Sequence, residues 1–429
     1  IAIDSMDYAV SPIYMDSLRN EGCYIYHTSR WLNGATIDTD SATILKIAKW
    51  DFVRTITLTR TQEKLNVKKE KWQAASEQHE RTKQIDNNAQ IEQLNLHMLH
   101  KENYHGQGIV IAIIDGGFLG IDTLGAFDAT RKQILGIYDT TDDLDSITGY
   151  TGDHGIKCFS TIAACTDNYI GTATKAQYYL IRSEEIFTES PKEMDNWVAA
   201  VELADSLGSD IISSSLGYAK FDDERFTLTY SDMNGQTTRC AQAANIAARK
   251  GMLVVVAAGN EGDKAWHYIT SPADAEDIIA VGATDVNGNI AAFSSYGPSV
   301  DGRVKPEVCA TGKQTSIINP LNNTVINGNG TSFACPLIAG MAACLWSALP
   351  DATNMEIRER IIRSADRYTQ PHEQYGYGIP DAWMAYQLAT HTTTLTTPTQ
   401  ATKIIQDGQL YILYNNEYYT ILGNKISKQ

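Results

Sequence analysis

Apolar runs of six or seven residues alternate with amphipathic stretches through the middle of the chain. The runs lie at 109–115, 178–183, 210–216, 252–258 and 278–283. Helical stretches lie between and after them, at 154–166, 191–207, 238–250, 331–348 and 354–365. Continuous apolar strands that alternate with helices are typical of a parallel sheet covered on both faces. The pattern predicts a doubly wound, mostly parallel α/β domain over residues 91–390.

The first 60 residues have a different order of elements. The pattern predicts an α-β-β-α-β unit with a helix at 11–22, strands at 23–29 and 32–40, a helix at 41–50 capped by Ser41, and a last strand at 53–59. This order matches a small α+β, ferredoxin-like domain that lacks its first strand. The polar, Lys- and Gln-rich stretch 61–90 is interpreted as an exposed linker.

The end of the chain also departs from the central pattern. Residues 391–402 are rich in threonine and are interpreted as a second linker. Residues 403–429 contain short apolar stretches separated by Asp-Gly and Asn-Asn turns, which predicts a short C-terminal β unit. Such a unit is too small to fold well alone.

Composition narrows the classes of partner. The chain has 429 residues, 43% of them hydrophobic, so a large core is available. A net charge of −16 argues against a nucleic-acid or anionic-membrane partner. No apolar run is long enough to predict a membrane span, and the chain shows no basic-then-apolar leader. The seven cysteines form no CxxC pair, so they predict buried small hydrophobes rather than a zinc site.

Residues of catalytic type stand where the predicted strands end and two predicted helices begin. Asp115 ends one strand and Asn260 follows another, while His154 and Ser332 each open a helix. Function in doubly wound sheets collects at the carboxyl ends of the strands. These four residues are therefore expected to lie close together.

Ser332 lies in a glycine-rich turn at the start of an apolar helix. A serine there can be a simple helix cap. Several neighbouring glycines, however, allow a substrate backbone to approach closely, and a helix N-terminus offers N–H groups to a developing oxyanion. A neutral serine nucleophile needs a base, usually histidine, which a carboxylate orients. Asp115, His154 and Ser332 supply these groups in the chain order Asp, His, Ser.

Five motifs resemble those of the subtilisin-like serine proteases, or subtilases: IAIIDGG, DHG, SSSLG, AAGNEG and NGTSFACPLIAG. The resemblance spans about residues 91–390. It implies that Asp115, His154 and Ser332 form the catalytic triad and that Asn260 donates its side-chain amide to the oxyanion. It also implies a secreted or cell-surface endopeptidase that acts on proteins or peptides through an acyl-enzyme and needs no cofactor.

The resemblance assigns further roles. The backbone of Ser215, Leu216 and Gly217 is expected to pair with substrate as a β-strand, and Glu261 is expected beside the pocket for the residue before the cleaved bond. Residues 1–60 resemble the propeptide domain of these enzymes, which acts as folding helper and inhibitor. The C-terminal segment resembles a sorting or anchoring appendage.

Two residues depart from the family's usual pattern. Gly116 stands where a hydroxyl residue usually follows the aspartate, and Ile156 stands where threonine usually follows His-Gly. These departures bear on supporting hydrogen bonds and leave the triad itself intact.

Several alternatives stay open from the sequence. The acid-rich stretch 138–153 offers oxygen ligands for calcium, but it lacks EF-hand spacing and a solvated loop is the favoured interpretation. Cys335, three residues after Ser332, is interpreted as a core residue rather than a thiol nucleophile. A catalytically silent subtilase that binds proteins is the alternative function, and an esterase or peptide ligase is another.

Overall fold

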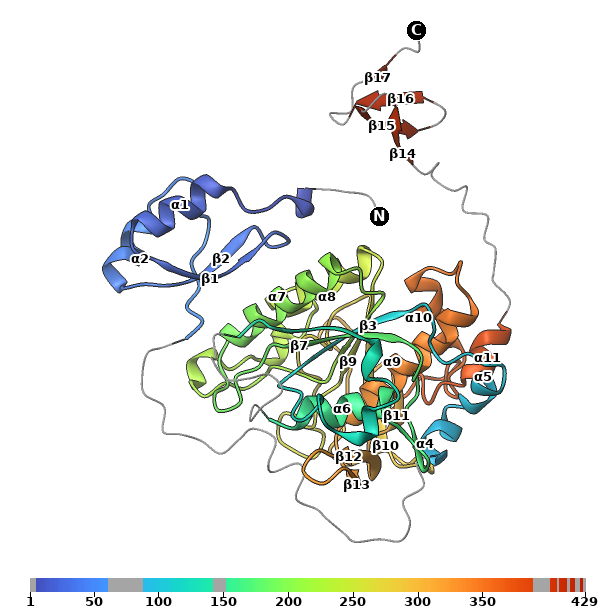
Figure 1. The fold of residues 1–429 in the computed structure, drawn as a ribbon. Coiled ribbons are helices and arrows are strands. Elements are labelled where there is room, and N and C mark those ends of the chain that lie inside the picture. The colour runs from blue at the N-terminus through green and yellow to red at the C-terminus, as the bar shows by residue number, and fades with distance from the viewer. Residues whose placement is uncertain are drawn as a thin grey trace. The chain divides into compact units, whose positions relative to one another are not determined.

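The computed structural model describes residues 5–60, 88–141 and 152–388, and four short strands between 402 and 426 (Figure 1). The chain divides into two compact units, Ile1–Gln387 and Leu388–Gln429.

The N-terminal domain consists of two helices packed on a two-stranded antiparallel sheet. Its elements in chain order are η1 (Ser5–Asp7), α1 (Pro12–Asn20), β1 (Tyr24–Ser29), β2 (Gly34–Asp38) and α2 (Ser41–Ile47). Met15, Leu18 and Ile47 form its small core with Cys23. The predicted α-β-β-α order is thus confirmed.

Two local predictions for this domain are wrong. Asp40, not Ser41, caps α2, because its carboxylate accepts hydrogen bonds from the backbone N–H groups of Ala42 and Thr43. Residues 54–60 form no strand. The alternating pattern at 53–59 has no partner in the β1–β2 sheet, and Thr59 O instead accepts a hydrogen bond from Lys192 N of the main domain.

The main domain is built on a seven-stranded sheet in which all neighbouring strands are parallel, in the order β11-β10-β9-β8-β3-β7-β4. The strands are β3 (Val110–Asp115), β4 (Ile134–Asp139), β7 (Gln177–Arg182), β8 (Ile211–Ser214), β9 (Leu253–Ala257), β10 (Ile279–Thr284) and β11 (Val308–Thr311). All five strands predicted from apolar runs are present. The two edge strands, β4 and β11, were not predicted.

Helices cover both faces of this sheet, as predicted. The helices are α6 (His154–Ala163), α7 (Lys192–Ser206), α8 (Arg239–Arg249), α9 (Thr331–Ala348) and α10 (Asn354–Arg363). Alternate residues of β3 face opposite ways. Ile111 and Ile113 belong to the cluster that holds α6, α9 and α10, whereas Ala112 and Ile114 belong to the cluster that holds α7 and α8. Figure 1 shows α7 and α8 side by side.

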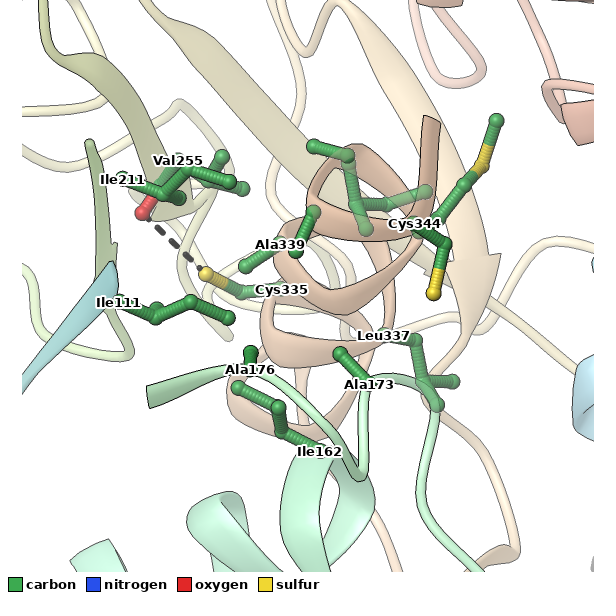
Figure 2. Packing of buried hydrophobic residues seen from close by; sticks show 14 of the residues in the cluster. Ile111, Ile162, Ala173, Ala176, Ile211, Val255, Cys335, Leu337, Ala339 and Cys344 are labelled. Carbon is green, nitrogen blue, oxygen red and sulfur yellow. Dashed lines mark hydrogen bonds between the residues drawn. The ribbon is translucent and has the colours of Figure 1, made fainter. Parts of the chain in front are cut away.

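Helix α9 runs through the centre of the larger cluster (Figure 2). Cys335 packs there against Ile111, Ile211 and Val255, and burial raises the pKa of its thiol to about 12. Cys335 is therefore a core residue, as predicted. By length and composition α9 is apolar enough to cross a membrane, but 89% of that window is buried inside the fold.

Shorter elements complete the main domain, and most were not predicted. They are α4 (Asn88–Gln93), α5 (His97–Lys101), η2 (Gly125–Phe127), η3 (Arg131–Gln133), β5 (Cys165–Thr166), β6 (Tyr169–Ile170), η4 (Glu224–Phe226), η5 (Tyr230–Asp232), β12 (Thr315–Asn319), β13 (Thr324–Gly328) and α11 (Ala382–Gln387). Helix α4 begins inside the stretch predicted as linker. The rest of that stretch, 61–87, lies outside the described residues, as do 142–151 of the acid-rich stretch.

The second unit contains a four-stranded antiparallel sheet in chain order. Its strands are β14 (Thr402–Gln406), β15 (Gln409–Tyr414), β16 (Glu417–Thr420) and β17 (Lys425–Ile426). The predicted C-terminal β unit is present, and Thr402, which was assigned to the linker, already belongs to β14.

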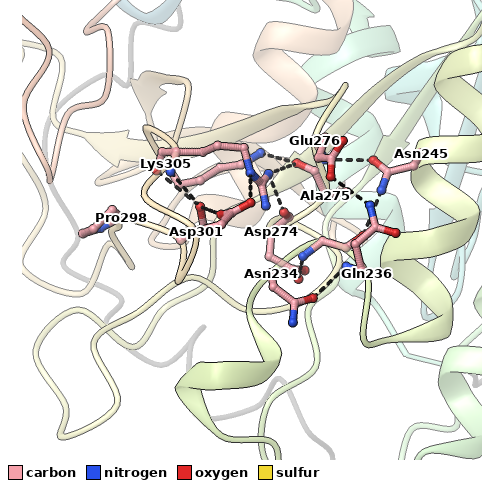
Figure 3. A network of polar contacts seen from close by, with 12 residues as sticks. Asn234, Gln236, Asn245, Asp274, Ala275, Glu276, Pro298, Asp301 and Lys305 are labelled. Carbon is pink, nitrogen blue, oxygen red and sulfur yellow. Dashed lines mark hydrogen bonds and ion pairs between the residues drawn. The ribbon is translucent and has the colours of Figure 1, made fainter.

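Polar contacts tie together the loops beside the start of α8 (Figure 3). Asn245 donates to Gly235 O at 2.8 Å and accepts from Glu276 N at 2.8 Å. Gly235 N donates to Asp274 Oδ2 at 2.7 Å. These bonds connect α8 to the loops that precede β10 and α8.

Lys305 anchors a further loop to the same network (Figure 3). Its ammonium group donates to Ala275 O at 2.6 Å and lies 2.7 Å from Glu307 Oε1, with none of the side chain exposed. Burial lowers the pKa of Lys305 from its usual value, and the Glu307 carboxylate opposes that shift. Arg358 Nη2 lies 3.3 Å from the same Glu307 oxygen.

We expect Lys305→Met to lower the free energy of unfolding by about 3 kcal/mol, because it removes one partner of a buried ion pair. Arg19→Met is the matched control. Arg19 pairs with Asp16 at 2.9 Å, but both side chains are more than half exposed, so the loss should be below about 1 kcal/mol. Urea unfolding of both variants measures the difference, and equal losses would contradict this account of Lys305.

Candidate active site

Asp115 and His154 lie in contact at the carboxyl end of β3. His154 Nδ1 lies 2.6 Å from Asp115 Oδ1, which also accepts a hydrogen bond from Gly116 N at 2.7 Å. Asp115 is fully buried and His154 is 6% exposed. Residue 155 must be glycine for this approach, because a Cβ there would lie 2.4 Å from Gly117 O and 2.9 Å from Asp115 Cβ.

The second oxygen of Asp115 has an unusual environment. Asp115 Oδ2 is buried and has no hydrogen-bond partner among the described residues. Gly116, which departs from the family's usual hydroxyl residue, supplies only its backbone N–H. Cys158 Sγ lies 3.8 Å from His154 Nδ1 and 3.9 Å from His154 Nε2, and burial raises the pKa of that thiol well above its usual value. The imidazole is therefore held by one carboxylate oxygen and flanked by a neutral thiol.

Ser332 lies in the first turn of α9. The helix is preceded by Gly330, whose φ of 155° favours glycine. Ser332 Oγ lies 3.4 Å from Ser215 O, and Ser215 Oγ donates to Ser332 O at 2.8 Å. The first N–H groups of a helix have no partner within it, so the N–H of Ser332 can be offered to a ligand.

Asn260 follows β9 and is oriented by the start of α9. Its Oδ1 accepts hydrogen bonds from Thr331 N at 2.9 Å and from Thr331 Oγ1 at 3.1 Å. With the carbonyl side fixed in this way, the Nδ2 side of the amide remains for another acceptor. Nδ2 itself donates no hydrogen bond to any described residue. The amide is thus prepared as a donor.

A cavity of about 230 Å³ brings the predicted residues together. Its lining includes His154, Ser215, Leu216, Gly217, Asn260, Glu261 and Ser332. Asp115 lies behind His154 and is the only predicted site residue outside the lining. Glu261 lies 2.8 Å from Lys264 and 3.9 Å from Lys220.

Sequence reasoning missed several charged residues of the same cavity. Asp153 and Lys157 lie beside His154, with their charged atoms 2.5 Å apart, and Glu184 and Glu189 line another part of the wall. The two glutamates come from the segment between β7 and α7, directly after the carboxyl end of a strand. That position could have identified them, because ligand sites in such sheets collect there.

The N-terminal domain contacts α7 through the turn between β1 and β2. Ser29 Oγ donates to Glu202 Oε1 at 2.5 Å, and Arg30 N donates to Glu202 Oε2 at 3.1 Å. Arg30 Nη2 also pairs with Asp205 at 2.6 Å. Trp31 is only 5% exposed and joins the apolar cluster of α7 and α8. Burial raises the pKa of Glu202 above its usual value.

Comparison with known proteins covers both domains. Residues 106–378 match the Subtilase family (peptidase S8), and residues 1–79 match the peptidase S8 propeptide domain of Bacteroidota. The chain is 32% identical to thermitase from Thermoactinomyces vulgaris over 285 residues, which cover 66% of this chain and 90% of thermitase. It is 29% identical to subtilisin DY from Bacillus licheniformis over 289 residues, which cover 67% of this chain and 93% of that protein.

Solved structures support the fold. The crystal structure of MycP1 from Mycobacterium smegmatis aligns with a TM-score of 0.57 at 20% identity, covering 72% of this chain and 86% of that one. The MycP3 protease of the type VII (ESX-3) secretion system aligns with a TM-score of 0.55 at 22% identity, covering 72% and 90%. The match over residues 106–378 and the 32% identity to thermitase show that the chain belongs to the Subtilase family and is a serine endopeptidase.

Proposed function

We propose that this endopeptidase cleaves peptide bonds through an acyl-enzyme on Ser332. The observation that carries the proposal is the 2.6 Å contact between Asp115 and His154 at a cavity that Ser332 and Asn260 also line. In this proposal Ser332 Oγ attacks the carbonyl carbon of the substrate, and His154 Nε2 accepts its proton. His154 then donates that proton to the leaving amine, and water hydrolyses the acyl-enzyme.

The remaining site residues act on orientation and charge. Asp115 keeps the proton of the neutral imidazole on Nδ1 and stabilises the imidazolium that forms. Asn260 Nδ2 and the backbone N–H of Ser332 donate to the oxyanion. The residues need no cofactor for these steps. A solvated loop stays the favoured interpretation of residues 138–153, with calcium binding there as the open alternative.

The substrate backbone pairs with residues 215–217 in this proposal. A bound peptide would add a strand there, next to Ser332. Gly217 faces Thr270, and a Cβ at residue 217 would lie 2.0 Å from Thr270 Oγ1, so only glycine fits this wall. Glu261 is proposed to border the pocket for the residue before the cleaved bond. Its pairing with Lys264 reduces the charge that it can offer to a basic substrate side chain.

We further propose that the chain is a secreted precursor. Residues 1–60 are an inhibitory propeptide, 61–90 the linker that is cut, 91–390 the catalytic domain, 391–402 a second linker and 403–429 a sorting or anchoring appendage. The docking of the N-terminal domain on α7 supports the inhibitory role. An isolated domain of about 60 residues is only marginally stable, so it gains from such docking.

Parallel incubation of the active chain and its Ser332→Ala variant tests the proposal. We expect only the active chain to lose an N-terminal fragment that ends between residues 59 and 91, because exposed linkers are where nicking concentrates. Mass spectrometry gives the cut site. Residues 1–60, added back in trans, should inhibit. An active chain that keeps its N-terminus while it cleaves casein at full rate would show instead that 1–60 is a permanent accessory domain.

A silent, protein-binding subtilase is the alternative. The paired Asp115 and His154 beside the cavity argue against it, since a binding protein needs no such pair. A fluorophosphonate probe separates the two, because it labels Ser332 only where the serine is activated.

A further inference from the structure

The end of the N-terminal domain contacts the catalytic domain through two consecutive residues. Thr59 O accepts a hydrogen bond from Lys192 N at 3.2 Å. Arg60 Nη1 lies 3.1 Å from Glu185 Oε2 and 3.3 Å from Glu185 Oε1. The preceding residues, 54–58, are all exposed. The segment is therefore held at this point by one carbonyl group and one basic side chain.

The carboxylate that receives Arg60 is positioned by the catalytic domain itself. Thr188 Oγ1 donates to Glu185 Oε2 at 2.8 Å, and Lys192 Nζ lies 3.0 Å from Glu185 Oε1. Burial alone would raise the pKa of Glu185, but Lys192, Thr188 and Arg60 together hold it below the usual value. The side chain of Glu185 is 9% exposed, whereas that of Arg60 is 46% exposed. Glu185 is thus oriented by Thr188 and Lys192 of the catalytic domain as well as by Arg60.

The surroundings of Arg60 are acidic and adjoin the active-site cavity. Arg60 lines a small hollow together with Glu189, Asp222 and Asp223. Glu189 N donates to Asp222 Oδ2 at 3.0 Å, which fixes the two residues to each other. Glu189 also lines the larger cavity that contains Ser332. A polypeptide that lies along the cavity can therefore reach this hollow with one of its side chains.

We propose that Glu185, with Glu189 and Asp222, forms a distal substrate subsite for an arginine or lysine side chain, and that Arg60 occupies this subsite until the N-terminal domain leaves. The proposal rests on the inhibitory role proposed above. The cut is proposed to follow Arg60, within 61–90, so a substrate side chain in the same place lies on the amino side of the scissile bond. The released fragment still carries Arg60 and competes with substrate for the subsite.

Hydrogen exchange of the uncut Ser332→Ala chain tests the contact without any need for activity. We expect Arg60→Glu and Glu185→Gln each to accelerate exchange at the Lys192 amide, which donates to Thr59 O, whereas Arg60→Lys retains its protection. Glu359→Gln is the matched control, because Glu359 pairs with Arg363 on the exposed face of α10. Unchanged protection of the Lys192 amide in Arg60→Glu would overturn the proposal, whether or not the chain proves active.

Peptide cleavage by the self-processed protein tests the preference. A series of quenched peptides shares one scissile sequence, and a single arginine replaces glutamine at successive positions before the cleaved bond. One position should raise kcat/KM by about three- to tenfold, mainly through KM, as expected for a partly buried charge pair at a binding interface. Glu185→Gln should lose this preference and Glu359→Gln should keep it. Cleavage without any preference overturns the subsite and leaves the proposed function standing.

Discussion

Ser332→Ala and His154→Ala are each expected to lower kcat/KM for a peptide substrate by about 10⁴- to 10⁶-fold. The first removes the proposed nucleophile and the second removes the proposed general base, and both groups act in the bond-breaking steps. The reason is geometric. Asp115 and His154 are paired at 2.6 Å at the edge of the cavity that Ser332 lines. The double variant should be no less active than either single variant, since members of a triad act as a unit. Initial rates on a quenched peptide, with active-site titration of the parent, measure these losses.

Two matched variants distinguish catalysis from folding. Ser347→Ala removes another serine of α9, whose hydroxyl donates to Cys344 O. His105→Ala removes the other histidine that precedes a glycine. Neither residue lines the cavity, so both variants should retain the rate of the parent. If Ser332→Ala digested casein as fast as Ser347→Ala, the assignment of the nucleophile would be wrong. Circular dichroism should show the same fold in all four single variants.

The sequence predicted the sheet and its covering helices because buried parallel strands carry an unmistakable pattern. Strand β9 (Leu253–Ala257) is apolar throughout, and Thr238 caps α8 just where the helical periodicity begins. The same pattern indicated two site candidates, since Asp115 ends such a strand and Asn260 follows another. The structure adds contacts that the spacing of residues in the sequence does not reveal, such as the two hydrogen bonds from Thr331 that orient Asn260.

Elements that depend on distant partners were not predictable in the same way. Residues 53–59 alternate like a strand, but alternation does not reveal whether a neighbouring strand exists. Their end instead contacts Lys192 and Glu185, more than 120 residues away along the chain. Glu185 and Glu189 follow the carboxyl end of β7, but the sequence does not show which of these two side chains faces the cavity. Only the fold shows that Glu189 lines the cavity and that Arg60 contacts Glu185.

Asn260→Ala is expected to lower kcat by about 10²- to 10³-fold and to change KM little, as removal of one oxyanion-hole donor does in subtilisin. The oxyanion develops only as the tetrahedral intermediate forms and is absent from bound substrate, so a donor aimed at it should affect kcat rather than binding. Asn260 also accepts two hydrogen bonds from Thr331 at the start of α9. The alanine variant therefore removes both a donor and a support for the helix that carries Ser332.

Two further variants separate these effects. Asn260→Asp keeps an oxygen for Thr331 but replaces the donor by a negative charge, so kcat should fall at least as far as in Asn260→Ala. Thr331→Val keeps the shape of its side chain and the backbone bond to Asn260, but it loses the hydroxyl bonds to Asn260 and to Gly259 N. We expect that variant to lose less than about tenfold in kcat, because both lost bonds are neutral hydrogen bonds that only support Asn260 and do not contact the oxyanion. A Thr331→Val loss as large as that of Asn260→Ala would mean that Asn260 acts by supporting α9. An Asn260→Asp variant with the kcat of the parent would exclude its role as oxyanion donor.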